Sequence, residues 1–170
     1  TLLVLSLSGD LMQDDAAAPD SATPVMKAGP HQFIPDTHLG DWNGPNRLWM
    51  MDPDEPSRSE GTIMTTGNVV QYTWSYEDKK HEGKIEFAGQ PGALRAAWVD
   101  TFHAAEGQGL HGFAVDGVMR LFGTYPAGDG VEWGWQIEID TRDREAFALK
   151  MFNVVPTVGP VPAVALLAAR

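Results

Sequence analysis

Apolar and polar residues alternate in short runs over most of the chain after residue 40. Tyr72, Trp74 and Tyr76 occupy every second position of one run, and Trp133 and Trp135 do so in another. Because the side chains of a strand alternate between its two faces, each set points to one side of a sheet. This period of two, with no helical period between the runs, predicts antiparallel strands.

The runs predict ten strands, separated by segments rich in Gly, Pro, Asp and Asn, which favour turns. Asp116-Gly117 is the sharpest turn signal, because a two-residue Asp-Gly loop matches the twist of paired strands. Short strands in this order predict an all-β fold, a single antiparallel up-and-down β-barrel of lipocalin-like size that is wide enough for one small ligand. The predicted strands span residues 41–50, 59–66, 68–77, 82–88, 93–101, 110–115, 118–124, 132–139, 145–153 and 162–169.

The first part of the chain follows a different pattern. Residues 2–8 form a short apolar run, and residues 14–24 are rich in Ala, Asp, Ser and Pro. This order is typical of the end of a secretory leader and a disordered linker, although a genuine first strand is the alternative. We therefore expect residues 1–24 to be a leader remnant and linker, and residues 25–170 to be one β-barrel domain. A leader implies a periplasmic or extracellular protein, and its absence a cytoplasmic one.

Residues 29–34 predict a short helix or turn that plugs one end of the barrel, since Pro35 prevents a longer helix. The six tryptophans then decide what the barrel encloses. Each large aromatic side chain buries about 150–250 Å², and that much apolar area on a surface would form large patches. We expect the rings to face inward, where they either fill the barrel as core or surround a ligand.

Composition narrows the range of partners. The chain has 170 residues, 43% of them apolar, which suits one domain with a sizeable core. Its net charge of −11 disfavours nucleic acid and anionic membrane surfaces as partners of the mature protein. The absence of cysteine excludes disulfides, thiolate nucleophiles and Cys-based metal sites. A small-molecule ligand is the expected partner, and the sequence gives no indication of the oligomeric state.

Asp100 is the most informative charged residue. Alternation places it on the same strand face as Trp98 and Phe102, so an inward face would bury the carboxylate. A buried charge needs a partner, and Arg47, which lies beside Trp49, is the candidate. The pair is interpreted either as a polar anchor for a ligand or as a structural ion pair at the barrel rim.

His103 near Asp100 suggests acid–base catalysis, but alternation puts the two side chains on opposite faces unless a bulge intervenes. The chain has no cysteine and no Gly-x-Ser-x-Gly nucleophile, so both residues are weak catalytic candidates, and a rim histidine is the alternative. No metal site or cofactor is predicted, because the histidines lack metal-ligand spacing. These histidines are His31, His38, His81, His103 and His111.

Five short motifs follow one another along the chain: Asn-Arg-Leu-Trp at 46–49, Tyr-Thr-Trp at 72–74, Trp-Val-Asp-Thr-Phe-His at 98–103, Trp-Gly-Trp at 133–135 and Met-Phe-Asn-Val at 151–154. In this order they resemble the bacterial family called domain of unknown function 1579. The resemblance covers about residues 29–170, and residues 39–44 are similar to that family's opening Gly-x-Trp-x-Gly element. It implies a lipocalin-like, calycin-type barrel and no function.

The chain departs from this family in two places. Pro160 and Pro162 are extra prolines, so we expect the closing strand to be short or badly paired at its start. Phe102 stands where a tryptophan is common, which keeps the bulk and loses a donor. The wider superfamily includes haem-binding barrels with a histidine on a late strand, and residues 112–170 contain no histidine, which argues against haem.

Together these patterns predict a small-molecule-binding barrel that holds a partly apolar ligand in an aromatic-lined interior. An enzyme on the same barrel, with Asp100 or His103 as acid or base, is one alternative and is less expected. A filled structural or interaction barrel without ligand is the other. An interior cavity of about 300 Å³ or more would favour binding, and a solid interior would exclude both the binding protein and the enzyme. The residues expected to contact the ligand are Arg47, Trp49, Trp74, Trp98, Asp100, Trp133, Trp135 and Asn153.

Overall fold

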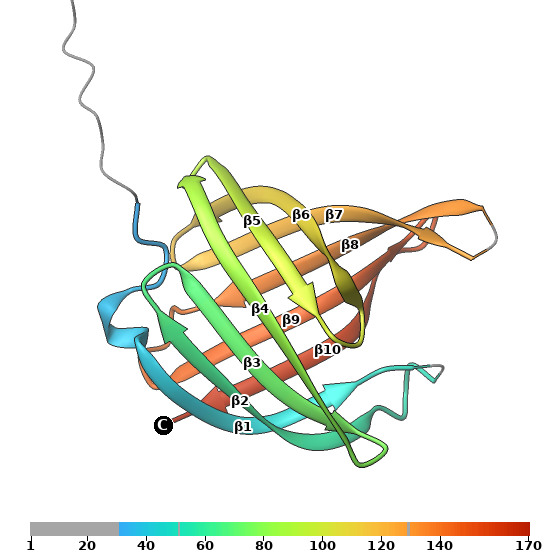
Figure 1. Ribbon diagram of the computed structural model, residues 1–170, viewed down its shortest axis with the longest axis horizontal. Coiled ribbons are helices and arrows are strands. Elements are labelled where there is room, and N and C mark those ends of the chain that lie inside the picture. The colour runs from blue at the N-terminus through green and yellow to red at the C-terminus, as the bar shows by residue number, and fades with distance from the viewer. Residues whose placement is uncertain (1–30, 51, 129) are drawn as a thin grey trace, which may run out of the picture.

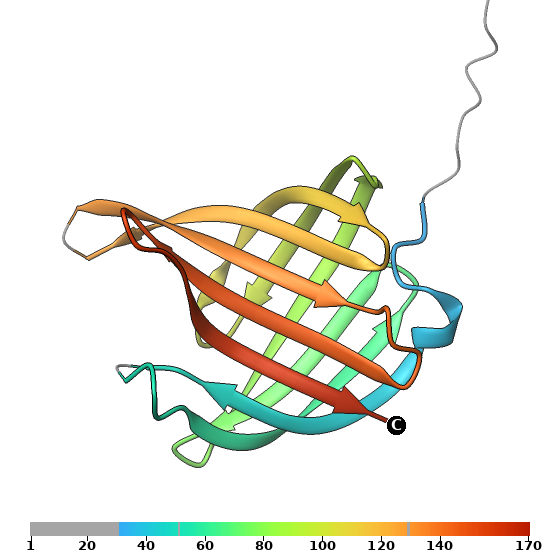
Figure 2. The ribbon, with the colours of Figure 1, turned by 180° about the vertical axis from the view of Figure 1, so that it is seen from behind.

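The computed structural model describes residues 31–50, 52–128 and 130–170, so the predicted leader and linker lie outside the described residues. It shows a closed antiparallel barrel in which each strand pairs with the next and β10 pairs with β1 (Figures 1 and 2). The predicted fold class is therefore confirmed. A 3-10 turn, η1 (Asp36–His38), precedes β1 (Gly40–Leu48), β2 (Ser57–Thr66), β3 (Val69–Tyr76), β4 (Lys79–Gln90), β5 (Ala93–Asp100), β6 (Ala104–Val115), β7 (Val118–Ala127), β8 (Val131–Asp140), β9 (Ala146–Val155) and β10 (Gly159–Ala169).

Alternation along the strands produces the barrel's two faces. On β5, Leu94, Ala96, Trp98 and Asp100 are buried, and every residue between them is exposed. The ten predicted strands are all present, and β6 is longer than predicted because residues 104–109 still pair with β5. No helix in the described parts of the chain is long and apolar enough to cross a membrane.

The segment before β1 plugs one end of the barrel (Figure 1). Ile34 is 0% exposed, and the backbone N–H of Phe33 donates to Asn68 Oδ1 at 2.7 Å. The buried His38 stacks on Trp42, with ring centroids 5.3 Å apart. A plug of this kind was predicted from residues 29–34, of which 29 and 30 lie outside the described residues. We call this the plugged end.

The opposite end, the distal end, carries the connections β1–β2, β3–β4, β5–β6, β7–β8 and β9–β10. There the β7–β8 hairpin extends beyond the rest of the barrel (Figure 1, right). A single cluster of buried apolar side chains joins the two ends. In its middle lie fully buried aliphatic residues such as Ile63, Ile85 and Ile137, which fill the inner face of the strands.

The expectation for the closing strand is wrong in part. β10 pairs with β9 over its whole length, from Gly159 to Ala169, with a register shift between Pro162 and Val164. Its paired register with β1 begins only at Val164. Pro160 and Pro162 therefore lie in the part of β10 that does not pair with β1. This part is a sheet edge, where a residue without a backbone N–H donor is tolerated.

Ile34 tests whether the plug belongs to the core. We expect Ile34→Ala to lower the free energy of unfolding by about 2–4 kcal/mol, because a fully buried side chain would leave a cavity. Urea denaturation measures the change, with Val158→Ala, at a site 70% exposed, as a control that should shift stability by less than about 0.5 kcal/mol. Equal stabilities of the two variants would show that the plug is not part of the folding unit.

Candidate functional site

Aromatic rings meet at the distal half of the barrel, and we call this group the distal aromatic cluster. The Trp74 and His103 ring centroids lie 5.8 Å apart, and those of His103 and Trp135 lie 5.0 Å apart. Trp135 in turn stacks on Trp98 at 5.3 Å with an interplanar angle of 11°. The cluster consists of Trp74, Tyr76, His81, Trp98, Phe102, His103, Tyr125, Trp133 and Trp135.

The end of β5 explains how Phe102 and His103 join this cluster. β5 ends at Asp100, its register with β6 shifts between Trp98 and Asp100, and residues 101–103 form a turn. The chain no longer alternates there, so Phe102 and His103 contact each other, at 4.8 Å between ring centroids. Strand alternation alone would place Asp100 and His103 on opposite faces. The irregularity after Trp98 brings the two side chains together instead.

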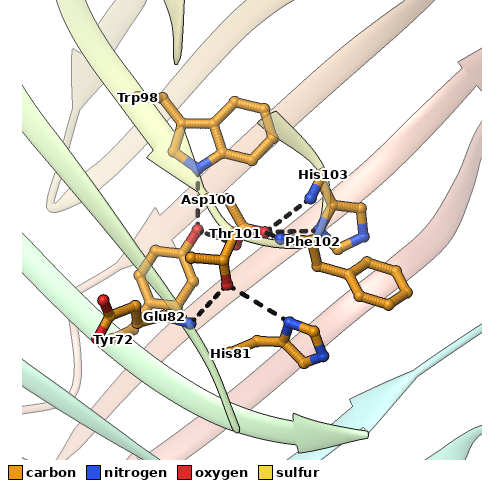
Figure 3. Close-up of polar contacts among 8 residues, drawn as sticks. All are labelled: Tyr72, His81, Glu82, Trp98, Asp100, Thr101, Phe102 and His103. Carbon is orange, nitrogen blue, oxygen red and sulfur yellow. Dashed lines mark hydrogen bonds and ion pairs between the residues drawn. The ribbon is translucent and has the colours of Figure 1, made fainter. Parts of the chain in front are cut away.

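Asp100 is the polar centre of the site (Figure 3). Its side chain is fully buried. Oδ2 accepts a hydrogen bond from the Tyr72 hydroxyl at 2.6 Å, and that hydroxyl oxygen accepts one from Trp98 Nε1 at 2.9 Å. Oδ1 accepts from the backbone N–H groups of Phe102 at 2.8 Å and His103 at 2.9 Å, and lies 3.2 Å from His103 Nδ1. One carboxylate therefore fixes both the turn and the imidazole.

A second anchor holds the same turn to β4 (Figure 3). The Thr101 backbone N–H donates to the Glu82 carbonyl at 3.0 Å, and the Glu82 N–H donates to Thr101 Oγ1 at 3.1 Å. Thr101 Oγ1 also lies 3.4 Å from His81 Nδ1. Hydrogen bonds to Glu82 on β4 therefore hold the outer side of the turn, and hydrogen bonds to Asp100 hold its inner side.

The electrostatics of the network favour an ionised Asp100 and a neutral Tyr72. Burial alone raises the pKa of Asp100, but hydrogen bonds from His103 and Tyr72 and the charge of His103 outweigh it and leave the pKa lowered. Burial, followed by the charge of Asp100, raises the pKa of Tyr72 well above its ordinary value. Because an ionised carboxylate only accepts hydrogen bonds, His103 Nδ1 carries a proton, and in the neutral ring Nε2 is an acceptor.

Two buried indole N–H groups of the cluster, Nε1 of Trp74 and Nε1 of Trp135, have no hydrogen-bond partner within residues 31–50, 52–128 and 130–170. Other tryptophans show the usual pairing: Trp42 Nε1 donates to the His38 carbonyl, and Trp49 Nε1 to the Pro53 carbonyl, both at 3.1 Å. The third buried polar atom without a partner in the described residues is Asn46 Oδ1. All three belong to inward residues in the distal half of β1, β3 and β8.

The structure brings together most of the residues predicted to contact a ligand. Trp74, Trp98 and Trp135 belong to the cluster, and Asp100 lies beneath it. Tyr125 connects Trp133 and Asn153 to the cluster. Its ring centroid lies 6.4 Å from that of Trp133, and its hydroxyl donates to Asn153 Oδ1 at 2.5 Å. These predicted residues therefore form one continuous group at the distal end: Trp74, Trp98, Asp100, Trp133, Trp135 and Asn153.

Two of the residues predicted to contact a ligand lie outside the cluster. Arg47 is exposed on the outer face of β1, because its neighbour Leu48 is an inward residue and 1% exposed. Trp49, one position further, is half-buried and bonds to the loop after β1. The predicted Arg47–Asp100 pair is consequently not formed, and Tyr72 and His103 take the role assigned to the guanidinium.

Tyr72 was predicted to face inward with Trp74 and Tyr76, but its role as the partner of Asp100 was missed. The hydrogen bond between the two depends on strand register, which the sequence pattern does not determine. Gly83 on β4 lies opposite Tyr72, and a Cβ there would lie 2.1 Å from the Tyr72 ring. The tyrosine ring thus occupies space that any other residue at position 83 would need.

Two further observations limit the chemistry. Within residues 31–50, 52–128 and 130–170, no group of three or more His, Asp or Glu side chains is arranged to hold a metal ion. A groove of about 820 Å³ opens on the outer face of β1 to β5, where Thr62, Thr73 and Lys84 line it. This groove lies on the opposite side of the sheet from the cluster. The other grooves found over the described residues also lie outside the barrel, so none of them is the interior cavity that would favour binding.

Comparisons with protein-family models and with curated proteins return no match for this chain. The barrel implied by the resemblance to domain of unknown function 1579 is confirmed by the strand topology. The family assignment itself is not supported by a matching family model.

The Asp100 network gives a prediction for stability against pH. Asp100→Asn removes a charged acceptor of several hydrogen bonds, so we expect a loss of about 2–4 kcal/mol in unfolding free energy at neutral pH. Since the folded pKa of Asp100 is lowered, its contribution is present above about pH 4, the ordinary value for an unfolded Asp, and is lost as pH falls through the folded value. The variant should therefore show a flatter loss of stability in acid.

Urea denaturation over a series of pH values measures both effects. Asp116→Asn is the control, because Asp116 is exposed in a tight Asp-Gly turn that Asn also suits. Identical acid profiles for wild type and Asp100→Asn would contradict the ionised network.

Proposed function

We propose that the protein binds a small, partly apolar molecule at the distal aromatic cluster. The observation that carries the proposal is the pair of buried indole N–H groups, on Trp74 and Trp135, whose rings both contact His103. A buried donor without a partner costs about 1–3 kcal/mol, and native proteins leave few of them. An oxygen atom of a bound molecule would accept these hydrogen bonds.

The surroundings suit such a molecule. Small-molecule sites are mostly apolar and aromatic, with a few polar groups that fix orientation. The cluster supplies the rings, and Asn46 Oδ1 adds an unpaired buried acceptor in the same half of the barrel. Small closed barrels of this size commonly hold one ligand inside.

Entry to the site is expected from the distal end. The plugged end is occupied by the fully buried Ile34 and by His38, which is 1% exposed. At the other end Phe102 and His103 are half-buried and belong to a three-residue turn rather than a strand. A shift of these two rings would expose the indole N–H groups without breaking a strand ladder.

The proposal includes membership of the domain of unknown function 1579 family and of the lipocalin-like class. The ordered motifs and the ten-strand barrel support it.

Export of the mature chain through a leader within residues 1–24 is part of the same proposal, and N-terminal sequencing of protein purified from its own host would test it.

One observation favours an acid–base enzyme as a second candidate. His103 Nδ1 lies against the buried Asp100 carboxylate, which orients the imidazole and leaves Nε2 as a base. If this candidate is right, His103→Gln should retain ligand affinity and lose turnover of the bound compound. A binding protein should show a change in affinity alone.

Binding can be tested with Prodan, an uncharged naphthyl ketone dye whose carbonyl accepts hydrogen bonds and whose emission shifts to the blue in apolar surroundings. We expect saturable binding with a blue shift. Trp74→Phe and Trp135→Phe each keep an aromatic ring but remove the N–H donor, so each should weaken binding about three- to tenfold, the effect of one lost hydrogen bond. Trp49→Phe is the matched control, because Trp49 lies outside the cluster, and it should bind as wild type does.

The competing explanation is that a buried water satisfies the indole groups of a filled barrel. In that case both cluster variants would change the unfolding free energy, and no protein in the series would bind Prodan saturably. That result would overturn the proposed function. If Prodan does bind saturably, native mass spectrometry of protein purified from its own host would identify the natural ligand.

A further inference from the structure

The free hydrogen-bonding groups around His103 indicate which polar group the ligand carries. Asp100 accepts from the Nδ1 side of the ring at 3.2 Å, so in the neutral imidazole Nε2 presents a lone pair. Within the described residues Nε2 has no hydrogen-bond partner, and the His103 side chain is 15% exposed. The ligand group that meets it must donate a hydrogen bond.

The same ligand group must also accept a hydrogen bond. The Trp74 and Trp135 rings lie 5.8 and 5.0 Å from the His103 ring, and each carries a buried N–H without a partner. A hydroxyl group both donates and accepts. A ketone or ether oxygen accepts but cannot donate, and an ammonium group donates but cannot accept.

Charge disfavours an anionic ligand. A carboxylate would lie close to the ionised Asp100, without a described Lys or Arg in the cluster to offset the repulsion. The protein's net charge of −11 adds to the same effect over longer distances. The ligand's polar group is therefore neutral.

The small number of free polar groups at the site indicates which kind of molecule carries the hydroxyl group. The polar groups without a described partner around the His103 ring are its own Nε2 and the indole N–H groups of Trp74 and Trp135, and the rings supply the rest of the contact surface. A sugar would bring several hydroxyls into this site, and each one without a partner would cost free energy. A flat aromatic ring with one hydroxyl satisfies the donors and stacks or packs edge-on against the surrounding rings.

We infer that the ligand is an aromatic alcohol whose hydroxyl donates to His103 Nε2 and accepts from the indole N–H of Trp74 or Trp135. This inference rests on the proposed function, because it specifies the ligand class for the same site. In this arrangement His103 is the residue that determines specificity, and Asp100 positions it.

Isothermal titration calorimetry with three matched probes tests the inference at about pH 8. β-Naphthol has a hydroxyl, its methyl ether keeps the oxygen but cannot donate, and naphthalene has neither. Wild type should bind β-naphthol about tenfold more tightly than the methyl ether, as expected for one hydrogen bond to a buried acceptor. Naphthalene should bind more weakly than both.

Variants separate the two sides of the hydroxyl. His103→Phe keeps a ring but removes the acceptor, so the two oxygen-bearing probes should bind within about twofold of each other; Asp100 keeps its bonds to Tyr72 and to two backbone N–H groups. His103→Gln retains an acceptor and should keep the preference for β-naphthol. Trp74→Phe or Trp135→Phe should weaken both oxygen-bearing probes and leave naphthalene unchanged.

The outcomes distinguish the inference from the proposed function. Equal binding of β-naphthol and its methyl ether by wild type would overturn the inference, while saturable binding would still support a ligand site. A preference for β-naphthol that persists in His103→Phe would also overturn it. If Prodan and all three probes fail to bind wild type, the proposed function itself is wrong. The wild-type comparison needs no variant and is unaffected if one fails to fold.

Discussion

The distal half of the molecule depends on how one buried carboxylate is satisfied. An ion as buried as Asp100 is stable only if its lone pairs are used. Tyr72 and two backbone N–H groups supply most of these bonds, and the N–H groups come from the turn that ends β5. Satisfying the charge therefore fixes the turn, and the turn places Phe102 and His103 against the inward tryptophans. The site is a consequence of electrostatic requirements in the core.

Different structures close the two ends of the barrel. The plugged end uses a segment before β1, in which apolar side chains are buried and His38 has partners for both ring nitrogens, Thr37 Oγ1 and the Asp143 carbonyl. The distal end uses aromatic rings, and two of its buried donors have no partner in the described part of the chain. Both ends bury apolar side chains, but among the described residues only the distal end keeps buried hydrogen-bonding groups without a partner.

Sequence reasoning predicted what depends on short-range pattern. Period-two alternation gave the ten strands, the inward direction of Trp74 and Trp135, and the burial of Asp100. It could not give the partner of Asp100, because Tyr72 and Asp100 meet through the register of β3, β4 and β5 rather than through spacing. Arg47 was predicted as the partner because it lies beside Trp49, although the adjacent apolar Leu48 indicates that the arginine faces outward. A short Asp side chain that accepts from backbone N–H groups two and three residues on is a common turn device, and that signal was available in the sequence.

The imidazole at the centre of the cluster links stability to recognition. Its Nδ1 side is committed to the Asp100 carboxylate, so the ring cannot rotate to present a donor from Nε2 while it is neutral. A site that needed only to be filled would not require this constraint, because a Phe at position 103 would supply the same ring contacts without a polar edge. The protein instead places an oriented acceptor on a ring that contacts Trp74 and Trp135, whose indole N–H groups have no partner among the described residues. That combination matches a group that both gives and receives a hydrogen bond, and no group in the described part of the chain occupies that role.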